Sequence, residues 1–215
     1  NEIEIGKGTV GSAFPTDSNF TDVRIVSGTA VYTGNFTPPT GPLTATGGTY
    51  SSTTNVNTSI TAGHTKLLLN MTQAKIRDVS QIQAGVQLHG DVVAASDQQH
   101  FFENTIEFPG TSDYITVQDQ PNFKAGEPFV IEGWHYLDAR TNSSPAIFSN
   151  YNSHTTGSLA LFAGHGSSTT TQYQLSQNGS FPAFNAGTVA YGQWVHFAVQ
   201  RNLDNNIQVY IDGTQ

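Results

Sequence analysis

Cysteine is absent from the 215-residue sequence, and charged residues make up only 11% of it. Without cysteine the chain can form neither a disulfide framework nor a thiolate metal site. Its stability therefore has to come from side-chain packing and strand pairing, and the small disulfide-stapled secreted classes are excluded.

Basic residues are also few. The chain has eight Lys and Arg side chains, which are scattered singly, and its formal net charge is −8. No basic patch can neutralise a run of phosphates, so we expect no nucleic-acid partner. No apolar run reaches the roughly 18 residues of a membrane-spanning helix, so we expect no membrane insertion. The start of the chain has neither an initiator Met nor a signal-peptide pattern, which indicates a segment of a longer chain.

The strong helix formers are scarce, and the chain contains a single Met. Thr, Ser, Asn and Gly take their place, and this composition is typical of strands and turns. Alternation of apolar and polar residues predicts three clear strands at 129–137, 194–201 and 207–211, of which the last two form a hairpin. Weaker alternation predicts further strands at 3–6, 21–26, 66–70, 85–93, 105–108, 114–117, 146–149, 158–163 and 172–176.

Four late segments, residues 108–117, 129–134, 194–199 and 209–214, follow one another in a characteristic order. They include Phe-Pro-Gly-Thr-Ser-Asp-Tyr-Ile at the start, Trp-Val-His-Phe-Ala-Val, and Val-Tyr-Ile-Asp-Gly at the end. As a combination they resemble the concanavalin A-like or laminin G-like jelly-roll family. The resemblance implies an all-β, antiparallel, lectin-like jelly-roll sandwich.

The early residues 3–8 and 20–25 are similar to the closing strands of that family, which should follow residues 212–214. The repeat is therefore cut out of phase. Three prolines at 35–42 and a Thr/Ser/Asn/Gly-rich stretch at 47–63 interrupt the strand pattern. We expect closing strands in residues 1–34, a linker in 35–65, and a sandwich lacking its closing strands in 66–215.

An apolar last strand at 207–211 without neighbours would leave unpaired backbone groups at a sheet edge. Three arrangements can cover that edge. A following repeat can supply the closing strands, residues 1–26 of the same chain can fold back as in a circular permutation, or a neighbouring copy can donate them.

Residues 28–39, together with 67–69 and 78–80, are similar to linkers that join tandem copies in long virion proteins of tailed phages. This resemblance implies a non-enzymatic virion structural or attachment protein, such as a fibre, capsid-decoration or appendage module. Its expected place is the particle surface. Its expected partners are other virion proteins or copies of itself, in an oligomer or a longer chain.

The main alternative is a calcium-dependent glycan-binding lectin module of a phage adhesin or bacterial surface protein. Lectin-like sandwiches often bind Ca²⁺, which takes oxygen ligands, and Asp113 in the opening turn is the best candidate. Asp212 is a second candidate, but Asp212-Gly213 is also the chemistry of a tight turn, and we favour the turn. No other cofactor is expected.

A weaker third alternative is a glucanase, since some relatives carry carboxylates on alternate residues of one strand. Glu2 and Glu4 share this spacing, but Ile5, Gly6 and Lys7 follow where the glucanase motif continues with further carboxylates. Two solvated carboxylates are the favoured interpretation, and no catalytic residue is assigned.

Histidine and the aromatic residues give no distinct site. His135 and His196 are expected to be hydrogen-bonded inside the sandwich, and Trp134 and Trp194 to pack in its core. Five aromatic residues lie in loop-rich surroundings, where they are freer to face solvent, namely Tyr151, Tyr173, Phe181, Phe184 and Tyr191. Spacing singles out none of them as a ligand site.

Overall fold

The computed structural model describes residues 2–8, 18–47, 53–72, 75–110, 112–118, 120, 126–138, 145–150, 158–164, 172–177 and 180–215, with the side chains of 181–184 left aside. Within these ranges every regular element is a strand, as expected for an all-β protein. None of the described residues forms a helix long and apolar enough to cross a membrane. The strands are β1 (Ile3–Ile5), β2 (Ser18–Ser27), β3 (Thr65–Leu69), β4 (Val86–His89), β5 (Val93–Ala95), β6 (Thr105–Phe108), β7 (Tyr114–Val117), β8 (Phe129–Leu137), β9 (Ala146–Ser149), β10 (Leu159–Ala163), β11 (Gln172–Gln177), β12 (Ser180–Thr188), β13 (Trp194–Arg201) and β14 (Ile207–Ile211).

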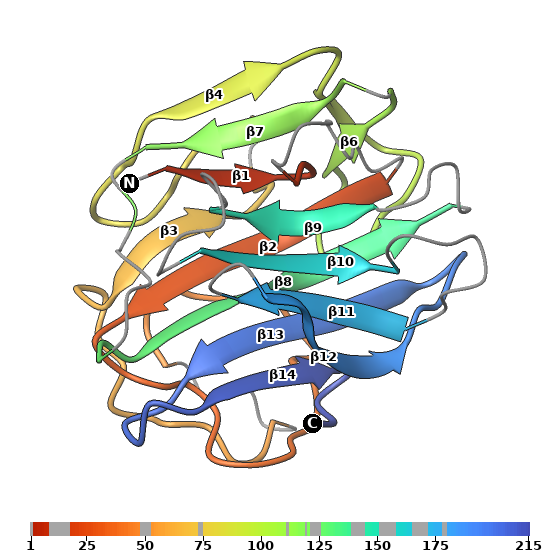
Figure 1. Ribbon diagram of the computed structural model, residues 1–215. Coiled ribbons are helices and arrows are strands. Elements are labelled where there is room, and N and C mark those ends of the chain that lie inside the picture. Colours follow the sequence, from red (N-terminus) through yellow and green to blue (C-terminus); the bar gives the residue numbers. More distant parts are fainter. Residues whose placement is uncertain are drawn as a thin grey trace.

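Two antiparallel sheets of seven strands each pack face to face (Figure 1). Sheet A, nearer the viewer in Figure 1, has the order β12-β11-β10-β9-β1-β7-β4. Sheet B lies behind it in the order β14-β13-β8-β2-β6-β5, and β3 also pairs with β2. The sequence-based prediction of an antiparallel sandwich is thus confirmed.

The first two strands of the chain lie in the middle of the two sheets. β1 lies between β7 and β9, and its Ile3 and Ile5 point into the core. β2 pairs along one side with β8 and along the other with β6 and then β3. In this structure, residues 3–5 and 18–27 therefore fold back onto strands of their own chain.

The main core lies between the sheets and is built from the apolar side of each strand. Its largest fully buried side chains include Phe20, Phe108, Phe148 and Phe197, and Phe20 and Phe108 meet edge to face at 5.2 Å. Aromatic groups of this size supply much of the apolar burial that stabilises a domain without disulfides.

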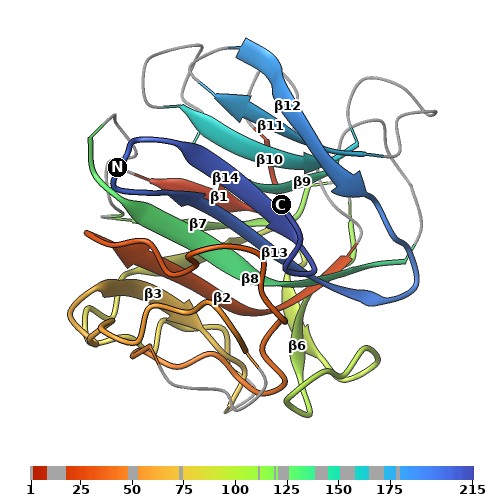
Figure 2. The same cartoon turned by 90° about the horizontal axis from the view of Figure 1, so that it is seen from below.

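A second apolar cluster covers the outer face of sheet B. Val31, Tyr32 and Phe36 pack there against Val130 and Tyr210 of the sheet. Residues 28–47, here called the strap, run across this face from the end of β2 towards the C-terminus (Figure 2). The stretch expected as a linker after residue 34 thus includes residues that pack closely on the sandwich.

Two regions of the chain differ from the sequence-based prediction in the number of their strands. β12 was not predicted, because Pro182 and Gly187 interrupt its pattern, yet β12 is an edge strand, where a missing N–H donor is tolerated. The single strand expected at 85–93 is two, since Gly90 turns the chain with a positive φ of 74° and directs β4 and β5 into different sheets.

Candidate functional site

A buried charged pair lies on the outer face of sheet B, beneath the strap. Arg24 of β2 and Glu132 of β8 are opposite each other in register, and Nε and Nη2 of Arg24 donate to Glu132 Oε1 at 2.8 and 2.5 Å. Tyr32 of the strap donates its hydroxyl to Glu132 Oε2 at 2.5 Å. Burial opposes ionisation of Glu132, but Arg24, His196 and Tyr32 outweigh it and hold the pKa of Glu132 at about 2.

Asp22 is a second buried acid on this face, with a carboxylate that accepts the Leu43 N–H at 3.1 Å. Its backbone has a φ of 52°, which is unusual for a residue other than glycine. Burial raises the pKa of Asp22 to about 7, and the Leu43 hydrogen bond, Thr21 and Arg24 only partly offset that effect.

Further buried polar contacts tie the strap to the sheet. Nη1 of Arg24 donates to the Thr44 carbonyl at 2.8 Å. Gln200 of β13 accepts the Tyr32 N–H at 3.0 Å and donates to the Tyr32 carbonyl at 2.7 Å. A glutamine that pairs with both backbone groups of one residue acts like a short piece of strand and fixes the position of the strap.

His196 completes the buried cluster, with its Nε2 atom 3.6 Å from Glu132 Oε2. Its side chain is fully buried, and its ring lies 5.1 Å from that of Trp134 and 5.6 Å from that of Phe36. Neither ring nitrogen has a hydrogen-bond partner among the described residues. The expected hydrogen-bonded histidine is therefore found at His135, which bonds Tyr173 Oη at 2.9 Å in the core, and not at His196.

An aromatic cluster at the margin of the strap links the charged pair to the surface. Sheet B contributes three of its rings, namely Trp134 and the half-buried Tyr136 and Trp194. The rings of His100 and Phe101 lie over the tryptophans. Trp194 Nε1 donates to the Gln99 carbonyl at 3.0 Å. Burial, with a smaller effect of His196, lowers the pKa of His100 to about 4, so this ring is neutral at physiological pH.

The core prediction is wrong for Trp194, which is half-buried at the start of β13. Trp134 is buried, but on the outer face of sheet B and not between the sheets. Tyr173 is not solvent-facing, because β11 directs it into the core, whereas Tyr191 is 36% exposed. Tyr151 and the side chains of Phe181 and Phe184 lie outside the described residues.

Glu2 and Glu4 each have a polar partner. Glu4, on the outer face of sheet A, lies 3.3 Å from Lys7 Nζ, and Ser149 Oγ donates to it at 3.4 Å. Glu2 accepts the Gln118 side-chain N–H at 2.9 Å. The exposed Glu2 and the half-buried Glu4 both have their carboxylates occupied in this way.

Asp113 is buried, and its two carboxylate oxygens accept backbone N–H groups of Asp91 at 2.8 Å and of Gly110 at 2.5 Å. Such contacts fit a carboxylate that fastens two loops together better than a calcium ligand. In the described part of the chain, no three His, Cys, Asp or Glu side chains gather around a possible metal position. The calcium role of Asp113 stays a prediction.

Asp212 and Gly213 form the tight turn favoured by the sequence. Their φ values are 48° and 75°, and Ile211 and Thr214 exchange two backbone hydrogen bonds around them. Asp212 also accepts the backbone N–H of His196 at 2.9 Å.

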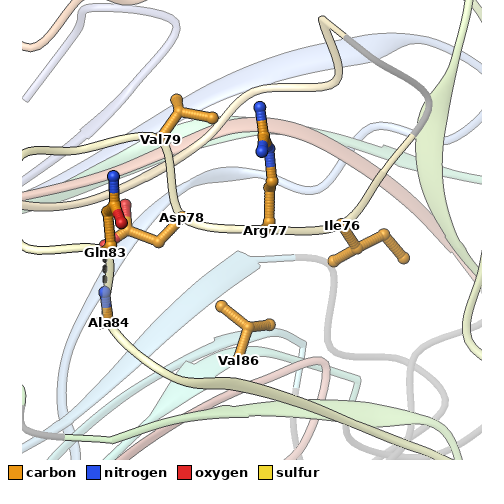
Figure 3. Close-up of a pocket in the computed structure, with 7 residues that line it drawn as sticks. All are labelled: Ile76, Arg77, Asp78, Val79, Gln83, Ala84 and Val86. Carbon is orange, nitrogen blue, oxygen red and sulfur yellow. Dashed lines mark hydrogen bonds between the residues drawn. The ribbon is translucent and has the colours of Figure 1, made fainter.

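A cavity of about 420 Å³ lies along the connection between β3 and β4 (Figure 3). Its apolar wall includes Ile76, Ala84 and Val86, and its polar wall Arg77, Asp78 and Gln83. The Asp78 carboxylate already accepts hydrogen bonds from Leu68, Ser80 and Ala84, so it holds the connection in shape.

Sequence reasoning did not identify Arg24, Asp22 or Glu132 as a cluster. The available signal was their position, because each is a charged residue inside a predicted strand of a chain with little charge. Such residues meet only if their strands are neighbours in the sheet. The sequence does not state directly which strands are neighbours.

Residues 109–215 match the family model of the Concanavalin A-like lectin/glucanases superfamily. Comparisons with curated proteins and with solved structures find no match. The matched segment contains β7 to β14, and two strands from the start of the chain add to its sheets: β1 lies between β7 and β9 in sheet A, and β2 pairs with β8 in sheet B. Residues 109–215 are therefore similar to the concanavalin A-like lectin/glucanases superfamily, and earlier strands of the same chain complete their sandwich.

Proposed function

We propose that this protein is a non-enzymatic structural or attachment module of a virion, in which the sandwich serves assembly or adhesion. The observation that carries the proposal is a group of exposed apolar side chains, Ile82, Leu88 and Val93, which are 45–49% exposed. They lie in and around β4 and β5, the edge strands at one end of sheets A and B.

Edge strands offer backbone N–H and C=O groups to a further strand. β4 and β5 each pair with one neighbour among the described strands, and only the turn at residues 90–92 separates them. Natural proteins usually protect such edges with charges, prolines or bulges. The apolar side chains at this end instead favour contact with another copy or another virion protein.

Sedimentation velocity over a range of concentrations tests the assembly surface. We expect the protein to self-associate, and Leu88→Lys with Val93→Lys to weaken association at least tenfold. Leu203→Lys is the matched control, because Leu203 is 84% exposed in the turn between β13 and β14, away from this edge. A monomer at every concentration, or equal loss in the control, contradicts self-assembly through β4 and β5.

The virion location is tested by immunogold electron microscopy with an antibody against the recombinant protein. Gold on purified particles from the source culture supports the proposal. Label confined to the particle-free secreted fraction contradicts it.

A glycan-binding module is the second candidate, and the aromatic cluster is the observation that favours it. Half-buried Trp194 lies against a loop that carries exposed Asp97 and Glu103, and a partly exposed aromatic ring beside polar groups is able to stack on a sugar. On a glycan array we expect Trp194→Ala to lose any binding and Tyr114→Ala, on the other sheet, to retain it. A chelator arm tests the calcium expectation, and absence of binding to every glycan contradicts this candidate.

A further inference from the structure

We propose that Asp22 is a proton-dependent latch that holds the strap on the outer face of sheet B. The inference is independent of the partner that the module binds. It rests on the way β2 presents Asp22 to the strap and on the charges that surround its carboxyl group.

A bulge in β2 places Asp22 beneath the strap. Thr21 pairs with Trp134 and Arg24 pairs with Glu132, so Asp22 and Val23 together face Gly133 of β8. The extra residue sends Val23 into the core between the sheets and Asp22 to the opposite face. The positive φ of Asp22 belongs to the same distortion, and strained backbone of this kind persists where the surrounding structure holds it in place.

The strap is fastened directly to Asp22. The Leu43 N–H donates to Asp22 Oδ1 at 3.1 Å, and the neighbouring Thr44 carbonyl accepts from Arg24, two residues along β2. Leu43 itself is fully buried. Release of Asp22 would therefore free the part of the strap around residues 43–46.

The charges around Asp22 are not balanced when its carboxyl group is ionised. Arg24 on β2 is the guanidinium of the cluster, and it already forms an ion pair with Glu132 on β8. His196 on β13 and Tyr32 of the strap face Glu132 from the other side. A second buried carboxylate would add a negative charge that Arg24 alone does not neutralise, so the closed strap favours protonated Asp22.

In an open state Asp22 is solvated and regains an ordinary acidic pKa, whereas burial in the closed state raises it to about 7. Closure therefore takes up a proton between about pH 4 and pH 7. The strap is held most firmly in mild acid, and its closing equilibrium weakens by up to about tenfold per pH unit until neutral pH.

Hydrogen exchange of the full chain at pH 5, 6 and 7, corrected for the intrinsic rates, tests the latch. We expect protection of the Leu43 amide to fall by up to about tenfold per pH unit relative to amides of β13, whereas the Tyr32 amide, which Gln200 holds, should change less. In Asp22→Asn the side-chain oxygen still accepts the Leu43 N–H but does not titrate, so the Leu43 amide should lose this dependence. Asp78→Asn, at another buried acid outside the strap, is the control and should keep the wild-type profile.

Equal protection of the wild-type strap across this range overturns the proposal, as does an unchanged slope in Asp22→Asn. If Asp22→Asn fails to fold, carboxyl ¹³C NMR of the wild-type protein decides. The latch is supported if the Asp22 carboxyl group titrates with a midpoint near 7 and the hydrogen-exchange protection of the strap changes over the same pH range. A midpoint near 4 with the strap closed overturns it.

Discussion

Arg24 and Glu132 lie directly opposite each other on neighbouring strands of sheet B, both buried, with the guanidinium bound to one carboxylate oxygen and the Tyr32 hydroxyl to the other. This contact joins three segments, since Arg24 belongs to β2, Glu132 to β8 and Tyr32 to the strap. Loss of one partner therefore leaves a buried group without compensation.

We expect Glu132→Gln to lower the free energy of unfolding by about 3–5 kcal/mol, because it leaves the Arg24 charge buried and unpaired. Arg24→Met should cost a similar amount, and the double variant less than the sum of the two. Urea unfolding at pH 7 measures all three. Glu2→Gln is the control for the same chemical change at an exposed carboxylate, where we expect a loss below about 1 kcal/mol. Additive losses in the double variant would contradict the coupling.

His135 should make the protein sensitive to acid. Burial, with a smaller effect of His196, lowers the pKa of His135 to about 3 in the folded state, against 6.5 when unfolded. Between pH 3 and pH 6.5 the His135 ring therefore binds a proton in the unfolded chain but not in the folded protein. The free energy of unfolding is highest above pH 6.5 and decreases as the pH falls towards 3. The loss from this residue is on the order of 4 kcal/mol.

Urea unfolding at pH 4.5 and pH 7 measures this effect. His135→Gln should lose less stability on acidification than the wild type, and His64→Gln, in a partly exposed loop, should match the wild type. An NMR titration in which the buried His135 ring becomes charged near pH 6 is the contrary result.

Gly133 should tolerate no side chain, because β2 passes close to it at the bulge. An added Cβ would meet the Val23 Cα at 3.1 Å and the Asp22 carbonyl oxygen at 3.3 Å, both of which are backbone atoms. We expect Gly133→Ala to destabilise the protein by about 1–3 kcal/mol in urea unfolding. Gly85→Ala is the matched control, since no atom lies within 4 Å of its added Cβ. Equal stability of the two variants would show that the bulge yields easily.

Alternation in the sequence predicts most of the strands, and the hairpin of β13 and β14 is the clearest case, followed by the Asp212-Gly213 turn directly after β14. The alternation of β8 also predicts a central strand, because both of its faces carry apolar residues. These features are local, so the sequence expresses them directly.

The candidate site was less predictable, because it depends on contacts between distant segments. Leu43 meets Asp22 only after the strap has folded back over sheet B, and the proline- and threonine-rich composition of that stretch is typical of a linker. His100 and Trp194 likewise come together from segments that show no shared pattern in the sequence.

The central position of β1 and β2 also affects the order in which the sheets can form during synthesis. A ribosome makes residues 3–27 before every strand with which they pair, and β2 has to wait for β8, about 110 residues later, before its longest edge is covered. Contacts of such large sequence separation slow folding, and unpaired strand edges promote association between chains in the interval. During synthesis, the two strands that end in the middle of the sheets are thus exposed for longer than the strands that flank them.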